Sequence, residues 1–139
     1  MSDNFPITIF HNPACGTSRN TLAMIEAAGY APTVVEYLQA GWTRPQLDDL
    51  LARMSIGPRE LLREKDTPAA ELGLLAEGVA DAVLLDAMVA QPILVNRPMV
   101  TTPKGAKLCR PSEMVLELLD RQPAGFTKED GAPVSPRRP

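Results

Sequence analysis

Cys15 is the residue of this sequence best placed for chemistry, because it stands in a loop between an expected strand and an expected helix. The loop covers residues His11 to Gly16, and Thr17 or Ser18 is a plausible N-cap for the helix. The first turn of a helix presents free backbone N–H groups and partial positive charge, which favour thiolate over thiol. The same groups bind oxyanions. We therefore expect a nucleophilic sulfur and an anion site at one place.

Two other thiol motifs do not fit this loop. A Cys-x-x-Cys dithiol needs a second cysteine where Ser18 stands, so the thiol that resolves a Cys15 adduct must come from elsewhere. A phosphatase-type loop needs an arginine six residues after the cysteine, where this chain has Thr21. That difference disfavours phosphotyrosine hydrolysis and the reductases built on the same loop.

Positive charge must accompany a thiolate that meets a dianionic tetrahedral oxyanion, because the two anions repel each other. Arginine neutralises such anions with paired hydrogen bonds. The candidates at expected strand and helix ends are Arg63, Arg97 and Arg110. A solvated surface role is common for arginine, and spacing alone does not bring all three to Cys15. His11 could stabilise the thiolate as an imidazolium, donate one hydrogen bond as a neutral ring, or serve structure only.

The sequence has few other residues that could form disulfides or bind a metal. The chain has two cysteines and one histidine, which excludes a disulfide framework and disfavours a zinc site, so no metal is expected. Cys109 lies on an expected strand beside Arg110, and we expect it to pack in the core rather than to act as a resolving thiol.

The elements that position these residues follow from hydrophobic spacing and from helix and turn signals. Strands are expected over 7–10, 33–37, 93–95, 99–101 and 106–109. Helices are expected from Thr17 or Ser18 to about Ala28, over about 80–90 and over 111–119. Further helices are expected to start at Thr43, at Pro58 and at Thr67-Pro68. The order is βαβ, a helical insert, then ββα, which predicts an α/β fold with a mixed sheet of the thioredoxin-like kind. We expect one domain over 1–120, with the insert at about 43–90, and a weakly ordered tail over 121–139.

The composition of the chain indicates the cellular compartment and the kinds of partner to expect. The 139 residues include 45% apolar and 22% charged residues, as in an ordinary globular domain, and the net charge of −3 argues against nucleic-acid binding by bulk charge. No apolar run reaches the length of a membrane span, and the first residues lack signal-peptide features. We therefore expect a cytoplasmic protein without a membrane segment.

Four segments resemble the glutaredoxin-coupled arsenate reductases. Residues 11–20, HNPACGTSRN, are similar to that family's active-site loop. Three further segments match other parts of the family pattern in the same order: Leu61–Arg63, Pro92–Pro98 and Leu108–Glu113. The similarity runs from about residue 7 to 119, with traces to about 130.

The resemblance implies roles for individual residues. Cys15 would be the nucleophile, and His11 would help to keep its thiolate charged. The residues implied to bind arsenate and the product intermediate are Arg63, Arg97 and Arg110. Pro98 would follow a cis peptide bond beside the active-site loop, to which Thr17 and Ser18 also belong. The implied reaction reduces arsenate to arsenite in arsenic detoxification, with glutathione as co-substrate, glutaredoxin as partner and no bound cofactor.

Two other functions remain compatible with the fold. Regulators that bind RNA polymerase share it, but they characteristically use a Cys-x-x-Cys switch that Ser18 removes here. A general glutathione-dependent oxidoreductase acting on protein mixed disulfides would also use one cysteine. Three arginines suited to a small oxyanion disfavour that alternative.

Overall fold

A computed structural model describes residues 5–134, which fall into two compact units. Within the described residues, the first unit comprises residues 5–36 and 97–134, and the second comprises Tyr37–Asn96. The chain therefore leaves the first unit at Glu36, the end of its second strand, and returns to it at Arg97, an arginine of the candidate site. The second unit is longer at both ends than the insert expected over about 43–90.

A four-stranded mixed sheet forms the centre of the first unit, with the order β2-β1-β3-β4. Its strands are β1 (Thr8–His11), β2 (Thr33–Glu36), β3 (Met99–Thr102) and β4 (Gly105–Leu108). β1 pairs in parallel with β2 and antiparallel with β3, which pairs antiparallel with β4. In this register Ile9 lies between Val34 and Val100, and Ile9 and Val100 are fully buried. The predicted α/β fold with a mixed sheet is confirmed.

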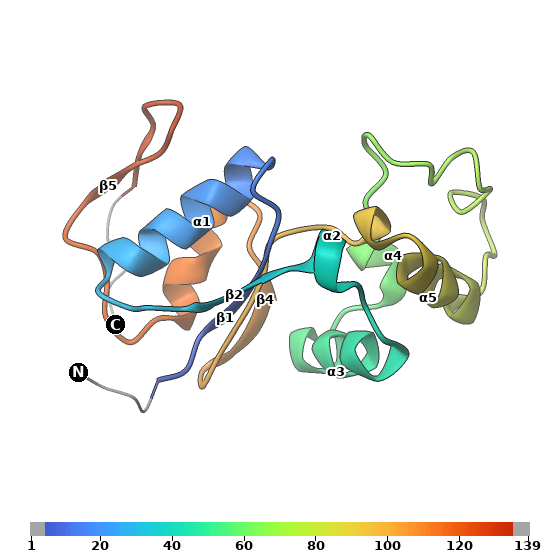
Figure 1. The fold of residues 1–139 in the computed structure, drawn as a ribbon, viewed down its shortest axis with the longest axis horizontal. Helices are drawn as coiled ribbons and strands as arrows, with labels where there is room; N and C mark the ends of the chain where they lie inside the picture. The colour runs from blue at the N-terminus through green and yellow to red at the C-terminus, as the bar shows by residue number, and fades with distance from the viewer. Residues whose placement is uncertain (1–4, 135–139) are drawn as a thin grey trace. The chain divides into compact units, whose positions relative to one another are not determined.

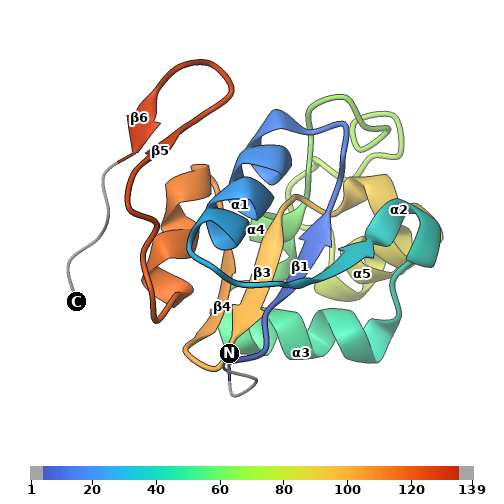
Figure 2. The ribbon, with the colours of Figure 1, turned by 60° about the vertical axis from the view of Figure 1, so that its left-hand side comes forward.

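Two helical elements pack together on one face of this sheet, the α-helix α1 (Gly16–Ala27) and the 3-10 helix η2 (Ser112–Leu118) (Figures 1 and 2). Both bury apolar side chains at helical spacing, so the sheet and the two helices enclose one core. Its members with full or nearly full burial are Ile9, Met24, Ile25, Val100, Cys109, Val115, Leu116, Leu118 and Leu119. Each such aliphatic side chain contributes about 1.5–3 kcal/mol through burial.

Short helices make up most of the second unit. They are α2 (Tyr37–Ala40), α3 (Arg44–Met54), α4 (Pro58–Leu61), α5 (Asp81–Ala90) and the 3-10 helix η1 (Pro92–Leu94). α3 starts at the capping box predicted from Thr43 and Gln46, whose side chains bond each other's backbone N–H groups. α5 packs against α3, α4 and η1.

Several expected elements differ in the structure. Ile93–Val95 was predicted as a strand, but Pro92–Leu94 forms η1 and only an isolated bridge joins Val95 to Leu62. Proline at the first position favours a helical turn over continued ladder bonding. The helix suggested at Thr67-Pro68 is a series of turns, and the expected helix over 111–119 is 3-10 rather than α.

The C-terminal segment contains a small antiparallel pair, β5 (Phe126–Thr127) and β6 (Pro133–Val134). The sequence suggested a weakly ordered tail over 121–139; its last residues, 135–139, lie outside the described part of the chain. No helix within residues 5–134 has the length and apolar character needed to cross a membrane.

Candidate active site

Cys15 lies at the N-terminus of α1 and is itself the N-cap residue. The sequence placed the cap at Thr17 or Ser18, so that prediction was wrong by two or three residues. The backbone N–H of Cys15 bonds the carbonyl of Asn12 at 3.0 Å, and the carbonyl of Cys15 accepts the N–H of Arg19 at 2.9 Å. The half-buried sulfur therefore stands beside the first helical turn, where N–H groups are free to meet an anion.

Two of the three predicted arginines converge on this sulfur. Nη1 of Arg110 lies 3.9 Å from Sγ of Cys15 and also donates to the carbonyl of Arg97 at 2.9 Å. The buried Arg97 guanidinium also acts on this sulfur, because it lowers the pKa of the Cys15 thiol. A thiolate with two guanidinium groups beside it can receive an anion that bare sulfur would repel.

The same contacts set the ionisation of Cys15. Burial alone would raise the pKa of the thiol, because it disfavours the charged form. The Ser18 N–H and the guanidinium groups of Arg97 and Arg110 donate to the sulfur and together outweigh burial. The pKa of Cys15 therefore lies below its ordinary value, and more of the reactive thiolate is present near neutral pH.

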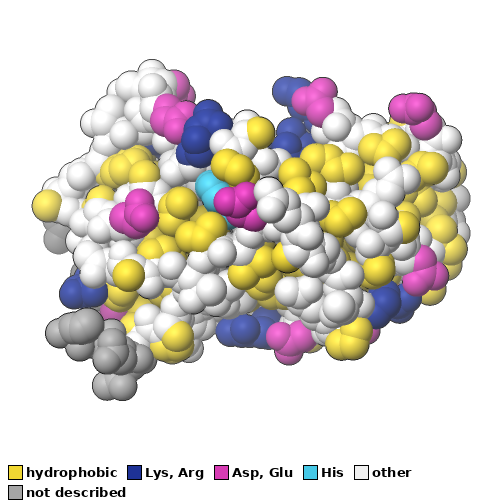
Figure 3. Space-filling view, viewed as in Figure 1, with side chains coloured by type: hydrophobic (Ala, Val, Ile, Leu, Met, Phe, Trp, Pro, Cys, Tyr) yellow, Lys and Arg dark blue, Asp and Glu magenta, His cyan; other side chains and the backbone are white. Residues whose placement is uncertain are grey.

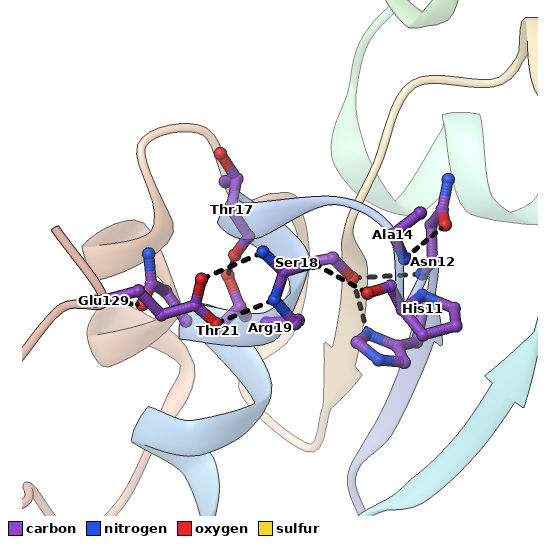
Figure 4. Close-up of polar contacts among 10 residues, drawn as sticks. His11, Asn12, Ala14, Thr17, Ser18, Arg19, Thr21 and Glu129 are labelled. Carbon is purple, nitrogen blue, oxygen red and sulfur yellow. Dashed lines mark hydrogen bonds and ion pairs between the residues drawn. The ribbon is translucent and has the colours of Figure 1, made fainter.

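His11 reaches the site through Ser18 (Figure 4). Nδ1 of His11 lies 2.6 Å from Oγ of Ser18, and that oxygen also accepts the backbone N–H of Asn12 at 3.1 Å. The three residues are buried. The hydroxyl thus joins the end of β1 to the first turn of α1.

Burial lowers the pKa of His11 below its ordinary value of 6.5. The carboxylate of Glu36 opposes this effect and the nearby positive charge of Arg19 adds to it. The ring is therefore neutral near pH 7. Of the alternatives left open by the sequence, this arrangement favours a neutral imidazole bonded to Ser18 over an imidazolium beside the sulfur.

Arg63 belongs to the second unit. Its backbone N–H donates to the carbonyl of Leu94 at 2.7 Å, and Nε donates to the carbonyl of Lys65 at 3.2 Å. The side chain is half-buried next to the bridge that joins Leu62 to Val95. Its role in binding an oxyanion stays a prediction.

Two cis peptide bonds flank the site arginines, one between Arg97 and Pro98 and one between Arg110 and Pro111. The resemblance implied the first; the second had no sequence signal beyond the proline itself. Each places an arginine immediately before a cis proline.

Cys109 is fully buried and follows β4. Burial raises the pKa of its thiol to about 12, so it is a poor nucleophile near neutral pH. Both cysteines are free thiols. Among residues 5–134, no group of three or more His, Cys, Asp or Glu side chains is arranged to hold a metal ion.

Asn12 of the loop and Arg19 of α1 have roles that spacing alone did not reveal. Oδ1 of Asn12 accepts the N–H of Ala14 at 2.9 Å, which closes an Asx turn; Asn before Pro is a turn signal that could have found it (Figure 4). Arg19 donates through Nη1 to the carbonyl of Pro13 at 2.8 Å. The backbone carbonyl of Thr17 accepts a hydrogen bond from the hydroxyl of Thr21 at 2.8 Å.

Surface charge is mixed on the face drawn in Figure 3. Lysine and arginine side chains lie there among acidic and uncharged ones and do not merge into one basic patch. The positive charge next to Cys15 comes from the guanidinium groups of Arg97 and Arg110.

Known proteins resemble this chain over most of its length. The model of the ArsC family matches residues 10–118. Arsenate reductase ArsI1 of Synechocystis sp. is 62% identical over 132 residues, covering 94% of this chain and 91% of the relative. The arsenate reductase of Escherichia coli strain K12 is 54% identical over 129 residues, covering 92% of both chains. The structure of an arsenate reductase from Vibrio cholerae aligns with a TM-score of 0.80 at 36% identity, covering 84% of this chain and all of that one. The chain therefore belongs to the ArsC family.

Proposed function

We propose that this protein is an arsenate reductase, an oxidoreductase that converts arsenate to arsenite in arsenic detoxification, with Cys15 as its nucleophile. The observation that carries the proposal is the placement of the Cys15 sulfur at the start of α1, with Nη1 of Arg110 at 3.9 Å and with Arg97 lowering the pKa of the thiol. A small oxyanion is the substrate that such a group of donors suits.

In the first step the Cys15 thiolate attacks arsenic. A sulfur–arsenic bond forms, and one arsenate oxygen leaves as water after taking up protons, while arsenic stays pentavalent. Arg97 and Arg110 are positioned to offset the negative charge of the oxyanion and of the adduct, and we assign Arg63 the same role. These groups are fixed before the anion arrives, so little reorganisation opposes the step.

In the later steps external thiols supply two electrons. Glutathione attacks the adduct and displaces a second oxygen as water, which gives an arsenic bearing two sulfurs. A glutaredoxin thiolate then attacks the glutathione sulfur, a mixed disulfide forms, and the electron pair of the broken arsenic–sulfur bond reduces arsenic to the trivalent state. Water releases arsenite and returns the Cys15 thiol.

External thiols are needed because the chain offers no suitable partner for Cys15. Ser18 occupies the position where a dithiol motif has its second cysteine, and Cys109 is buried with a pKa of about 12. Glutathione and glutaredoxin are the reductants that we assign, and a reducing cytoplasm is the compartment that supplies them.

A coupled assay tests the proposal. NADPH oxidation is followed with glutathione, glutaredoxin and glutathione reductase, with and without arsenate. We expect arsenate-dependent turnover in the native protein, none in Cys15→Ser, and retained turnover in the matched variant Cys109→Ala. Turnover that persists in Cys15→Ser would remove this residue from the mechanism.

A further inference from the structure

The 126–134 hairpin, made of β5, β6 and the turn between them, contacts both segments that carry the candidate active site. Arg19 and Glu129 form a bidentate ion pair, with Nε 2.8 Å from Oε2 and Nη2 2.9 Å from Oε1 (Figure 4). The backbone N–H of Glu129 also donates to Oδ1 of Asn20 at 3.0 Å. On the other side, Lys128 pairs at 2.6 Å with Glu113 in the first turn of η2, close in sequence to Arg110.

Arg19 connects this hairpin to the loop of Cys15. The same guanidinium that binds Glu129 donates through Nη1 to the carbonyl of Pro13 at 2.8 Å. The pair also covers Gly16, because a Cβ added there would lie 3.6 Å from Nη2 of Arg19 and 3.9 Å from Oε1 of Glu129. Arg19 therefore hydrogen bonds Pro13, which precedes Cys15 in the chain, and packs over Gly16, which follows it.

The turn that presents Glu129 is held by its own hydrogen bonds. The N–H of Lys128 donates to the carbonyl of Ala132 at 2.8 Å, and the N–H of Gly131 donates to the carbonyl of Lys128 at 2.9 Å. Gly131 has φ +92°, a conformation that glycine adopts without strain. Val134 is buried in the core of the first unit, which fixes the end of the hairpin.

We propose that the 126–134 hairpin acts through the Glu129–Arg19 ion pair to position the loop that carries Cys15. Glu129 is a positioning residue, since it bonds Arg19 and not the sulfur. An isolated exposed ion pair contributes little, but this pair is bidentate and belongs to a network with Pro13 and Asn20. The inference deepens the proposed function, and the ionisation of Cys15 tests it without arsenate.

Two physical roles for Glu129 predict opposite changes when its charge is removed. If Glu129 only neutralised Arg19, its loss would leave more positive charge near Cys15 and lower the pKa of the thiol. If Glu129 positions the loop, its loss lets the Ser18 N–H and the guanidinium groups of Arg97 and Arg110 drift from the sulfur, and that pKa rises. The sign of the change separates the two roles.

The experiment measures the rate of Cys15 alkylation by iodoacetamide across pH, with mass spectrometry of the Cys15 peptide. We expect Glu129→Ala to raise the pKa of Cys15 by about half a pH unit and to lower kcat for arsenate about twofold to fivefold. Glu129→Gln, which can still accept a hydrogen bond from Arg19, should give intermediate values. Point variants are preferred to truncation because truncation would remove the buried Val134.

A matched control is Asp86→Ala, which breaks the exposed Arg44–Asp86 pair of the second unit and should leave the alkylation profile unchanged. An unchanged or lowered pKa of Cys15 in Glu129→Ala would overturn the positioning role. If the native protein failed to reduce arsenate, the proposed function would fail, whereas the alkylation profile would still decide the role of Glu129.

Discussion

Nδ1 of His11 lies 2.6 Å from the hydroxyl oxygen of Ser18, which also accepts the backbone N–H of Asn12. This relationship gives His11 an indirect route to Cys15. The His11 ring and the Ser18 hydroxyl share a hydrogen bond whose direction is set by the tautomer of the ring, and the backbone N–H of Ser18 donates to the Cys15 sulfur. We therefore propose that the histidine acts by fixing Ser18, whose backbone N–H stabilises the thiolate.

Removing the Ser18 hydroxyl should weaken the fold locally. In Ser18→Ala the buried Nδ1 of His11 and N–H of Asn12 both lose their partner, so the free energy of unfolding should fall by about 1–3 kcal/mol. Urea unfolding followed by circular dichroism measures it. Thr21→Ala is the control, because its hydroxyl bonds only a carbonyl of its own helix and should cost less. Equal losses in both variants would contradict a special role for Ser18.

The titration of His11 should appear at low pH. Because burial lowers the pKa of His11 in the folded state, its ring signal in a proton NMR titration should shift at a pH below 6.5. The chain has one histidine, so the assignment is direct. The unfolded chain binds this proton more tightly, so the stability due to the neutral ring is present above about pH 6.5 and is lost as pH falls through the folded pKa. A folded pKa at or above 6.5 would contradict the lowering by burial, and a folded pKa above 7 would exclude the neutral ring as the main form near pH 7.

The order of the main elements could be predicted from the sequence because hydrophobic spacing and capping signals are local. The capping box at Thr43 and the helix that starts at Pro58 appear as expected. The prediction was wrong where local signals conflict. Ile93–Val95 has the composition of a strand, but Pro92 before it favours a helical turn. Ser18 is of a residue type favoured at N-caps, but its hydroxyl instead hydrogen bonds the His11 ring and the backbone N–H of Asn12.

The candidate site could be predicted only in part, because its contacts join distant segments. Cys15 was predicted as the nucleophile from the loop in which it lies. The arginines were predicted as anion ligands from their residue type and their positions at expected strand and helix ends. Nothing in the spacing shows that Arg110 meets a sulfur 95 positions earlier, or that Glu129 pairs with Arg19. Such contacts depend on how β1, β3 and β4 align in the sheet, and that register is a property of the whole core.

Loss of a site arginine should make Cys15 harder to ionise. Arg110→Ala removes the guanidinium that lies 3.9 Å from the sulfur, so the pKa of Cys15 should rise and alkylation near pH 7 should slow severalfold. Arg110→Lys should raise the pKa of Cys15 less than Arg110→Ala does, because lysine keeps the positive charge but lacks the paired N–H donors of a guanidinium group. Stopped-flow alkylation across pH measures the change. Arg121→Ala, which contacts Tyr30 and the carbonyl of Gly29, is the control, and an equal change there would contradict a local effect.

Arg63 should affect arsenate binding without affecting the free thiol. It belongs to the second unit, and the hydrogen bonds that lower the pKa of Cys15 come from Ser18, Arg97 and Arg110. If its guanidinium binds the oxyanion, Arg63→Ala should raise KM for arsenate about tenfold or more, the cost of one charge-assisted hydrogen bond, and leave the alkylation profile of Cys15 unchanged. Steady-state kinetics in the coupled assay give KM and kcat separately. Arg59→Ala is a matched control, since Arg59 lies in the same unit and donates to the carbonyl of Ala76. A KM in Arg63→Ala no higher than in Arg59→Ala would leave the oxyanion to Arg97 and Arg110 alone.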